Sequence, residues 1–323
     1  LAAWARDELF DVLPLEWTHR GLGPVPSAET VNGRALRWLD NLPKDAPFFL
    51  FLNYMDAHER NFAPGGMHTA FPGFDEGIAR SLAFTGLWDD LITARTDLTS
   101  RIRTHLNALY DGQIRYLDKE FLRFLKELKR RHLYDETLIV LVSDHGEYLG
   151  ERGLVGHMRG VTVEQLWVPL VVRYPYATRT GKVQDVFETR KLFYLILQQV
   201  GHSMKEVLHP WAGFSELYPR FAGEPPPGAV LPFLHHYQSG VYFDAMKYTW
   251  SSDGNRALFD LEEDPREFAD AKGRNPRGTE RGAELTRLFL QDVPLADAIR
   301  PAGGALSPEE SQRLEALGYL NSP

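Results

Sequence analysis

The chain has 323 residues, of which 43% are hydrophobic and 25% are charged, as in a globular protein with one large domain or one domain and a smaller appendage. Its net charge of -8 at pH 7 comes from acidic and basic residues that are mixed along the chain, which excludes a basic surface for nucleic acid. The absence of cysteine excludes disulfides, thiolate metal ligands and cysteine nucleophiles. No apolar run approaches the roughly 18 residues that a transmembrane segment needs.

The first part of the chain predicts an irregular lead-in, a helix and a strand. Residues 1–26 contain several Pro and Gly and match no export signal, and because the chain does not begin with Met we expect an upstream portion to be absent. Ser27 is typical of a helix N-cap, and the apolar spacing behind it predicts a helix over 28–41. Residues 48–55 predict a strand that is apolar on both faces, and therefore central and parallel.

A loop, a long helix and two more strands follow. Residues 59–100 are rich in Gly, Pro and polar side chains, which predicts a long loop of the kind that often overlies a cleft. Apolar residues recur with helical period over 101–132, so we predict an amphipathic helix there. Residues 138–142 form an unbroken apolar run, short enough for a strand buried on both faces, and residues 168–172 predict a third core strand.

The pattern changes towards the C-terminus. Thr189 predicts the start of a helix that runs to Val200. Beyond a Pro-rich crossing, short strands are predicted over 230–237, 240–250 and 257–261. Their close spacing and their Ser-Gly and Asp-Gly turns favour an antiparallel sheet.

These elements predict an α/β fold in which helices flank a largely parallel mixed sheet, with a small antiparallel C-terminal subdomain. The predicted domains are residues 1–212, an α/β core that is incomplete at its N-terminus, and residues 213–323, which hold the small sheet and terminal helices. We expect the substrate site at the carboxyl ends of the core strands, where loops leave the sheet.

The strand predicted over 138–142 ends in a carboxylate and an imidazole side by side, Asp144 and His145. Because metals bind at this edge of an open α/β sheet, the pair is half of a candidate metal site. The alternative is an Asx-type turn in which Gly146 supplies a positive φ.

An ordered series of motifs surrounds this pair. It comprises Tyr110, Asp118, Asp135-Glu-Thr-Leu-Ile-Val-Leu-Val-Ser-Asp-His-Gly-Glu147, Leu149-Gly-Glu151, Gly156-His157 and Val168-Pro-Leu-Val-Val-Arg-Tyr-Pro175. On these residues the chain resembles the sulfatase family of the alkaline phosphatase superfamily. Asp56-Ala57-His58 after an apolar strand is similar to the family's Asp-x-His motif, and Lys247-Tyr-Thr ahead of Leu258-Phe-Asp-Leu-Glu-Glu-Asp-Pro-Arg-Glu267 resembles its C-terminal subdomain.

The resemblance implies metal-dependent hydrolysis of a sulfate ester, with Asp144 and His145 as ligands of a divalent cation. Calcium is the expected ion, and manganese and zinc, which suit an imidazole better, are the alternatives. His58 and His157 match family positions around the sulfate and the leaving oxygen, and Arg159 is a second positive group for the sulfate. The alternative roles are structural: His58 would cap a strand end, and the other two would be exposed polar residues of a Gly-rich loop.

The family's nucleophile is missing from this sequence. It is a Cys or Ser, converted to formylglycine, in a Cys/Ser-x-Pro-x-Arg motif, but the nearest match here has Pro24 in place of the nucleophile and Ala28 in place of the Arg. The family's early pair of adjacent Asp ligands is missing too, because Asp89 and Asp90 follow the His58 strand. We therefore predict the C-terminal part of a longer enzyme, inactive alone, whose formylglycine lies in a missing N-terminal segment or on a complementary chain. A complete protein that kept the scaffold without the reaction is the alternative.

The predicted substrates are sulfated or phosphorylated small molecules or glycans. A phosphodiesterase or phosphonate hydrolase of the same superfamily is one alternative function, and a non-catalytic binding or scaffold subunit is another. We predict a periplasmic or extracellular location, with the cytoplasm as the alternative.

Overall fold

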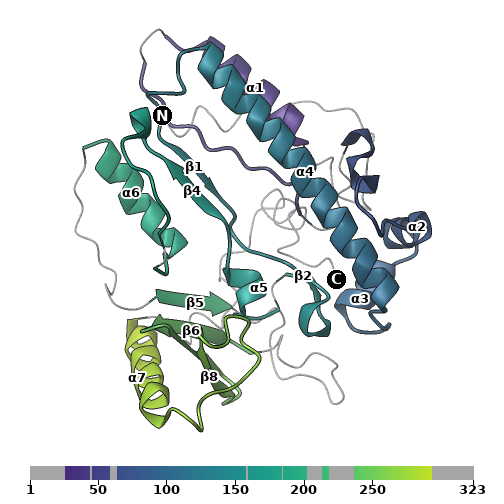
Figure 1. Ribbon diagram of the computed structural model, residues 1–323, viewed down its shortest axis with the longest axis vertical. Coiled ribbons are helices and arrows are strands. Elements are labelled where there is room, and N and C mark those ends of the chain that lie inside the picture. Colours follow the sequence, from purple (N-terminus) through teal and green to yellow (C-terminus); the bar gives the residue numbers. More distant parts are fainter. Residues whose placement is uncertain are drawn as a thin grey trace, which may run out of the picture. The chain divides into compact units, whose positions relative to one another are not determined.

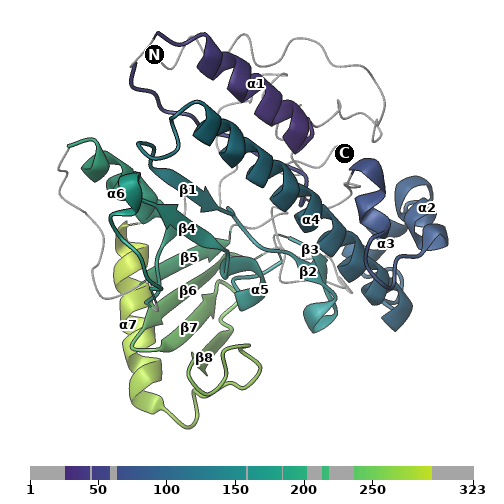
Figure 2. The same cartoon turned by 45° about the horizontal axis from the view of Figure 1, so that its top comes forward.

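The computed structural model describes residues 26–43, 46–58, 64–157, 159–183, 185–201, 213–217 and 236–292. The chain divides into two compact units, and Figures 1 and 2 label their α-helices and strands. Within the described residues, the first unit comprises the chain up to Asp90 together with 98–135, and the second comprises 91–97 and the chain from Glu136 onward. The predictions for 1–25, for most of the strand at 230–237 and for the C-terminal tail lie outside the described residues.

Two helices, α1 (Ala28–Asp40) and α4 (Ser100–Arg130), run side by side in the first unit (Figure 1). Ser27 caps α1 with its side chain, as the sequence predicted. Arg131, just past the end of α4, donates hydrogen bonds of 2.8 and 3.0 Å to the two carboxylate oxygens of Asp40. Both helices are confirmed close to their predicted bounds. The prediction succeeds because the apolar periodicity and the capping residues of each helix indicate the same ends.

Short helices occupy much of the stretch that was predicted as a long loop, so that prediction was wrong. These helices are η1 (Pro64–Thr69), α2 (Glu76–Phe84) and α3 (Leu87–Ile92). Asp75 caps α2 by accepting a hydrogen bond from the Ile78 amide, and the Asp75 amide in turn donates to Nδ1 of the buried His105 on α4. The Gly and Pro residues between these short helices give the whole stretch the composition of a loop. That average composition masked the local capping residues, such as Asp75, that mark where individual helices begin.

Residues 48–55 form no strand in the structure, which corrects a second prediction. Side-chain exposure alternates along this segment, and Phe49 and Phe51 are 71% and 78% exposed. A strand is defined by its hydrogen-bonded ladder, and the described residues contain no ladder partner for this segment. The apolar run therefore presents one face to solvent in this chain.

In the second unit, β1 (Ile139–Val142) pairs with β4 (Leu170–Arg173) in an antiparallel ladder, with Val140 opposite Val172. Every strand pair in the described part of the chain is antiparallel, so the predicted largely parallel sheet is not confirmed. An unbroken apolar run indicates burial but carries no information about strand direction. Neither face of this ladder is fully buried, and Val171 is 58% exposed.

A small hairpin and several short helices lie between these strands and beyond them. The hairpin pairs β2 (Tyr148–Leu149) with β3 (Val155–Gly156). The short helices are η2 (Glu151–Gly153), α5 (Val163–Leu166), η3 (Pro175–Ala177), η4 (Thr189–Lys191) and α6 (Leu192–Gln199). The helix predicted to start at Thr189 is thus confirmed as a 3-10 turn that leads into α6. None of the described helices has the length and apolar character that a membrane span requires.

The predicted antiparallel sheet in the C-terminal part is confirmed. Its strands, in spatial order, are β5 (Gly213–Leu217), β6 (Gln238–Phe243), β7 (Met246–Ser251) and β8 (Arg256–Asp260), and α7 (Pro276–Asp292) packs against the sheet (Figure 2). The single strand predicted over 240–250 is two strands, because Asp244 and Ala245 adopt positive φ and form a tight turn. The predicted domain boundary at residue 212 falls inside the second unit and stays a prediction.

Candidate functional site

The loop after β1 is held against α5 by backbone and side-chain hydrogen bonds. The Gly146 amide donates to the Gln165 carbonyl at 2.8 Å, and the buried Gln165 side chain donates back to the Gly146 carbonyl at 3.0 Å. A Cβ atom at Gly146 would lie 2.1 Å from the Glu164 carbonyl oxygen. Gly146 has no positive φ, so the glycine is required by close backbone contact and the turn alternative was wrong on this point.

This anchored loop presents Asp144 and His145 together. The Asp144 side chain is 74% exposed, and its Oδ1 accepts a hydrogen bond from the His145 amide at 3.0 Å. Nδ1 of His145 lies 2.9 Å from the Gly146 carbonyl oxygen, which can only accept, so Nδ1 carries the proton. In the neutral ring Nε2 then carries the lone pair, and it lies 3.9 Å from Oδ2 of Asp144.

This spacing fits two ligands of one cation. Oxygen ligands of Ca²⁺ lie about 2.3–2.6 Å from the ion, and zinc–imidazole distances are about 2.0–2.1 Å. Two such ligand atoms can be separated by about 4 Å around one ion, so the atoms of Asp144 and His145 can share an ion without rearrangement. The Nδ1 hydrogen bond to a carbonyl is also the usual way in which a metal-binding imidazole is oriented.

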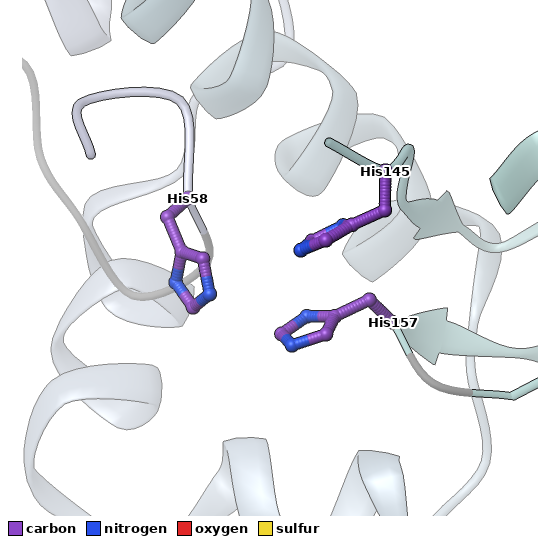
Figure 3. A group of neighbouring side chains, drawn as sticks. All are labelled: His58, His145 and His157. Atoms are coloured by element: carbon purple, nitrogen blue, oxygen red, sulfur yellow. The ribbon is translucent and has the colours of Figure 1, made fainter. Parts of the chain in front are cut away.

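His157 follows β3 and lies against His145, as Figure 3 shows. The two rings stack with their centroids 4.4 Å apart and their planes 20° from parallel. His157 is buried, and its Nδ1 is 3.6 Å from Oε1 of Glu147, whose side chain is also buried. The structure therefore brings three predicted residues, Asp144, His145 and His157, to one place.

Glu147 is the site residue to which sequence reasoning assigned no role. It stands three residues after Asp144, in the same Asp-His-Gly-Glu series, but a lone Glu after a glycine is a common surface residue. Only the pairing of Tyr148 with Gly156 in the hairpin brings Glu147 next to His157. A hairpin could have been predicted here, because few residues separate its two strands in the sequence. The residues that flank such strands, Glu147 and His157, must then lie close together.

Arg159 is also in the second unit, two residues beyond His157, and its side chain is buried. The alternative that His157 and Arg159 are exposed polar residues of a loop is therefore wrong. A buried guanidinium carries a large desolvation cost unless it meets acceptors or an anion, and the predicted role of Arg159 at the sulfate stays a prediction.

His58 belongs to the first unit, where a turn holds it (Figure 3). Its amide donates to the Met55 carbonyl at 3.1 Å, and Gln113 of α4 donates to the His58 carbonyl at 3.4 Å. Asp56, at the start of this turn, accepts a hydrogen bond from the Ala28 amide and so caps α1 from a distance in sequence. Burial raises the pKa of Asp56, and the Ala28 hydrogen bond opposes the rise. The predicted role of His58 at the substrate stays a prediction.

Comparison with known proteins decides the family. Residues 16–202 match the family model described as Sulfatase. The chain belongs to the sulfatase family. It is 30% identical over 204 residues to the choline-sulfatase of Rhizobium meliloti (strain 1021), a match that covers 59% of this chain and 37% of that protein. It is 33% identical over 98 residues to the multifunctional alkaline phosphatase superfamily protein PehA of Trinickia caryophylli, which covers 30% of this chain and 19% of that protein.

Solved structures extend the likeness to the fold. The phosphonate monoester hydrolase of Agrobacterium radiobacter superposes with a TM-score of 0.57 at 21% identity, over 84% of this chain and 63% of that one. The matched proteins have the sulfatase or alkaline phosphatase-like α/β fold, so the predicted α/β class is shown. This sulfatase-family chain spans less than two thirds of the length of the curated relatives it matches.

Proposed function

We propose that this chain supplies half of the active site of a metal-dependent hydrolase of sulfuric esters. The observation that carries the proposal is the meeting of Asp144 Oδ2 and His145 Nε2 at 3.9 Å, with the His157 ring stacked on His145. Membership of the sulfatase family and the match to a choline-sulfatase support a sulfate ester as the substrate.

In this proposal, Asp144 and His145 hold a divalent cation. When bound, the cation neutralises negative charge on the sulfate group as it is transferred. The carboxylate oxygen suits Ca²⁺, which is our first choice, whereas the imidazole nitrogen suits Mn²⁺ or Zn²⁺ better. The exposed Asp144 side chain remains accessible to such an ion from solvent.

His157 and Arg159 contact the substrate in this proposal. Because His157 is stacked on a cation ligand, its ring lies within reach of a group that binds that cation, and it can pass a proton to the leaving oxygen. Oε1 of Glu147 lies 3.6 Å from Nδ1, so in this proposal the carboxylate faces that side of the ring and Nε2 is left for the substrate. The guanidinium of Arg159 then binds a sulfate oxygen in a charge-assisted hydrogen bond.

We infer that the nucleophile and the remaining cation ligands come from a further segment of polypeptide. The sequence contains no Cys and no Ser in a Ser-x-Pro-x-Arg motif, so no residue of this chain can become the family's formylglycine. The exposed apolar side chains of the segment around Phe49 and of β4, which holds Val171, support this inference, because exposed apolar patches usually mark an interaction surface. For His58 we keep the role that the family resemblance implies, a contact with the sulfate group.

A phosphonate monoester or phosphodiester is the second candidate substrate. The structural likeness to a phosphonate monoester hydrolase and the match to the multifunctional PehA favour it. Sulfate and phosphate esters both present tetrahedral anions, so the same cation and the same Arg159 would serve either. Paired assays with an aryl sulfate and an aryl phosphonate monoester separate the two.

Cation binding is testable on the 323-residue chain. We expect isothermal titration to detect binding of Ca²⁺, Mn²⁺ or Zn²⁺, and we expect the bound ion to raise the Tm by mass action. Asp144→Asn and His145→Ala should abolish both effects. Asp185→Asn, which removes an exposed carboxylate elsewhere in the second unit, is the matched control and should change neither. Equal binding by all four proteins would refute the proposed ligands.

The activity assay uses the longest natural polypeptide, by which we mean the longest natural protein that contains these 323 residues. We expect it to hydrolyse an aryl sulfate and the 323-residue chain to be inactive under the same conditions. His157→Ala should lower kcat by about 10² to 10⁴, the usual worth of a positioned acid. Turnover by the 323-residue chain itself would refute the inference that the nucleophile lies elsewhere. Detection of the natural polypeptide in the periplasmic or extracellular fraction tests the proposed location.

A further inference from the structure

A fully buried ion pair lies in the C-terminal part of the second unit. Lys247 of β7 and Glu267, in the loop after β8, are 2.7 Å apart between Nζ and Oε1, and both side chains are shielded from solvent. Burial lowers the pKa of Lys247 to about 8, an effect that the nearby Glu267 opposes. A buried ion pair is a poor source of stability, because desolvation of two charges offsets most of their attraction.

Both members of the pair hold the backbone of the loop that follows His157 and Arg159. Lys247 Nζ donates a hydrogen bond to the Val161 carbonyl, and Oε2 of Glu267 accepts one from the Val163 amide at 3.2 Å. The pair thus holds the chain on both sides of residue 162. One buried carboxylate serves two partners, and one buried ammonium does the same.

The hairpin that leads into His157 is fixed to the same place. Arg152, in the turn between β2 and β3, donates to the Glu267 carbonyl at 3.1 Å and to the Arg266 carbonyl at 2.7 Å. Its Nε also donates to Glu164 at 3.0 Å, in the first turn of α5. The segments before and after His157 therefore converge on one loop of the C-terminal subdomain.

There is little room for this arrangement to relax. A Cβ atom at Gly240 of β6 would lie 3.3 Å from Cε of Lys247 and 3.7 Å from the Val161 side chain, so the lysine stem and the loop fill the space beside the sheet. Tyr148, at the start of the hairpin, is buried and its hydroxyl hydrogen-bonds to Thr162. The hairpin and the loop consequently also hold each other.

We propose that Lys247 and Glu267 are positioning residues, which fix the loop of His157 and Arg159 so that both side chains meet the substrate in a set geometry. Neither residue touches the reacting atoms. The effect on catalysis rests on the proposed function, whereas the effect on the loop does not. The small antiparallel sheet is thereby part of the site's support and more than an appendage.

An apolar replacement of the pair separates positioning from stability. Lys247→Met alone leaves the Glu267 carboxylate buried without its partner, so we expect the Tm to fall. The double variant with Lys247→Met and Glu267→Met removes both charges and keeps similar volume, so the Tm should recover much of that loss. It cannot restore the hydrogen bonds to residues 161 and 163. Lys272→Met is the control, because it removes an exposed ion pair of 3.0 Å with Asp270.

Hydrogen–deuterium exchange of the full 323-residue chain is the readout. In the double variant we expect the amides of residues 159–166 to exchange about tenfold faster or more, because the loss of roughly one hydrogen bond changes the opening equilibrium by about that factor. The amides of β6 and β7 should keep wild-type protection. Lys272→Met should change neither region. Wild-type exchange of residues 159–166 in the double variant would overturn the proposal and leave the pair a structural feature only.

The longest natural polypeptide provides the catalytic comparison. At a temperature well below the Tm of every variant, we expect the double variant to lose about tenfold or more in kcat on an aryl sulfate, with Lys272→Met unchanged. Full kcat in a double variant whose loop exchanges faster would overturn the catalytic part of the proposal. If no natural polypeptide hydrolyses the ester, the proposed function fails, and the exchange experiment still decides whether Lys247 and Glu267 hold the loop.

Discussion

Replacement of Gly146 by Ala tests whether close backbone contact holds the Asp144–His145 loop in place. The added Cβ atom would lie 2.1 Å from the Glu164 carbonyl oxygen, where ordinary contacts begin at 3.4 Å. The loop and α5 must therefore separate by more than about 1 Å, because the Cβ atom and the Glu164 carbonyl oxygen are both fixed to the backbone and neither can rotate away. Movement of the loop also breaks the two hydrogen bonds between Gly146 and Gln165.

The expected cost follows from these two effects. Overpacking against a fixed neighbour costs about 1–3 kcal/mol, and each of the two hydrogen bonds contributes about 0.5–1.5 kcal/mol. The free energy of unfolding should therefore fall by roughly 2–6 kcal/mol. At about 2–4 °C per kcal/mol for a unit of this size, the Tm should fall by at least about 4 °C. Cation affinity should fall as well, since the displaced loop no longer holds Asp144 and His145 in the same place.

Urea unfolding and cation titration of the 323-residue chain measure both quantities. Gly273→Ala is the control, because a Cβ atom there meets nothing within 4 Å and its φ is not positive. We expect the control to be as stable as the wild type or slightly more stable. A Gly146→Ala variant with wild-type stability and cation binding would refute the reasoning, since it would show that the loop can move without cost.

Three further outcomes are expected, each measurable by urea unfolding. Asp56→Asn should stabilise the chain at pH 7. Burial raises the pKa of the Asp56 carboxyl above 3.8, so the folded state binds the carboxyl proton more tightly than the unfolded state does. The wild type therefore loses stability as the pH rises through the folded pKa, whereas an Asn side chain does not ionise. Because Asn still accepts from the Ala28 amide, the gain should shrink towards pH 3, and a gain independent of pH would contradict this account. Leu258→Ala should cost about 2–5 kcal/mol, because Leu258 is fully buried between the sheet and α7, and a loss under 1 kcal/mol would mean that this core is loosely packed. Tyr148→Phe should cost about 0.5–1.5 kcal/mol through the lost hydrogen bond to Thr162, and an unchanged midpoint would show that the bond has no net value.

Much of the fold could be predicted from local signals. Ser27 and the apolar spacing behind it identified α1, and the same kind of periodicity identified α4, because a helix needs only contacts close in sequence. The strand direction of β1 and β4 could not be predicted, since an apolar run is compatible with either direction. The turn at Asp244 was missed for a related reason: neither residue at its centre is a glycine, and positive φ there is imposed by the hairpin.

The sequence by itself determined the family motifs, the helices α1 and α4, and the placement of Asp144, His145 and His157 among the candidate residues, because each of these is encoded by residue type and spacing over short stretches. Only the tertiary structure decided that Glu147 lies against His157 and that Lys247 and Glu267 hold the neighbouring loop. Those contacts join residues that are far apart in the chain or on opposite strands of a hairpin. Their geometry depends on how the sheet and loops pack, and no local pattern specifies it.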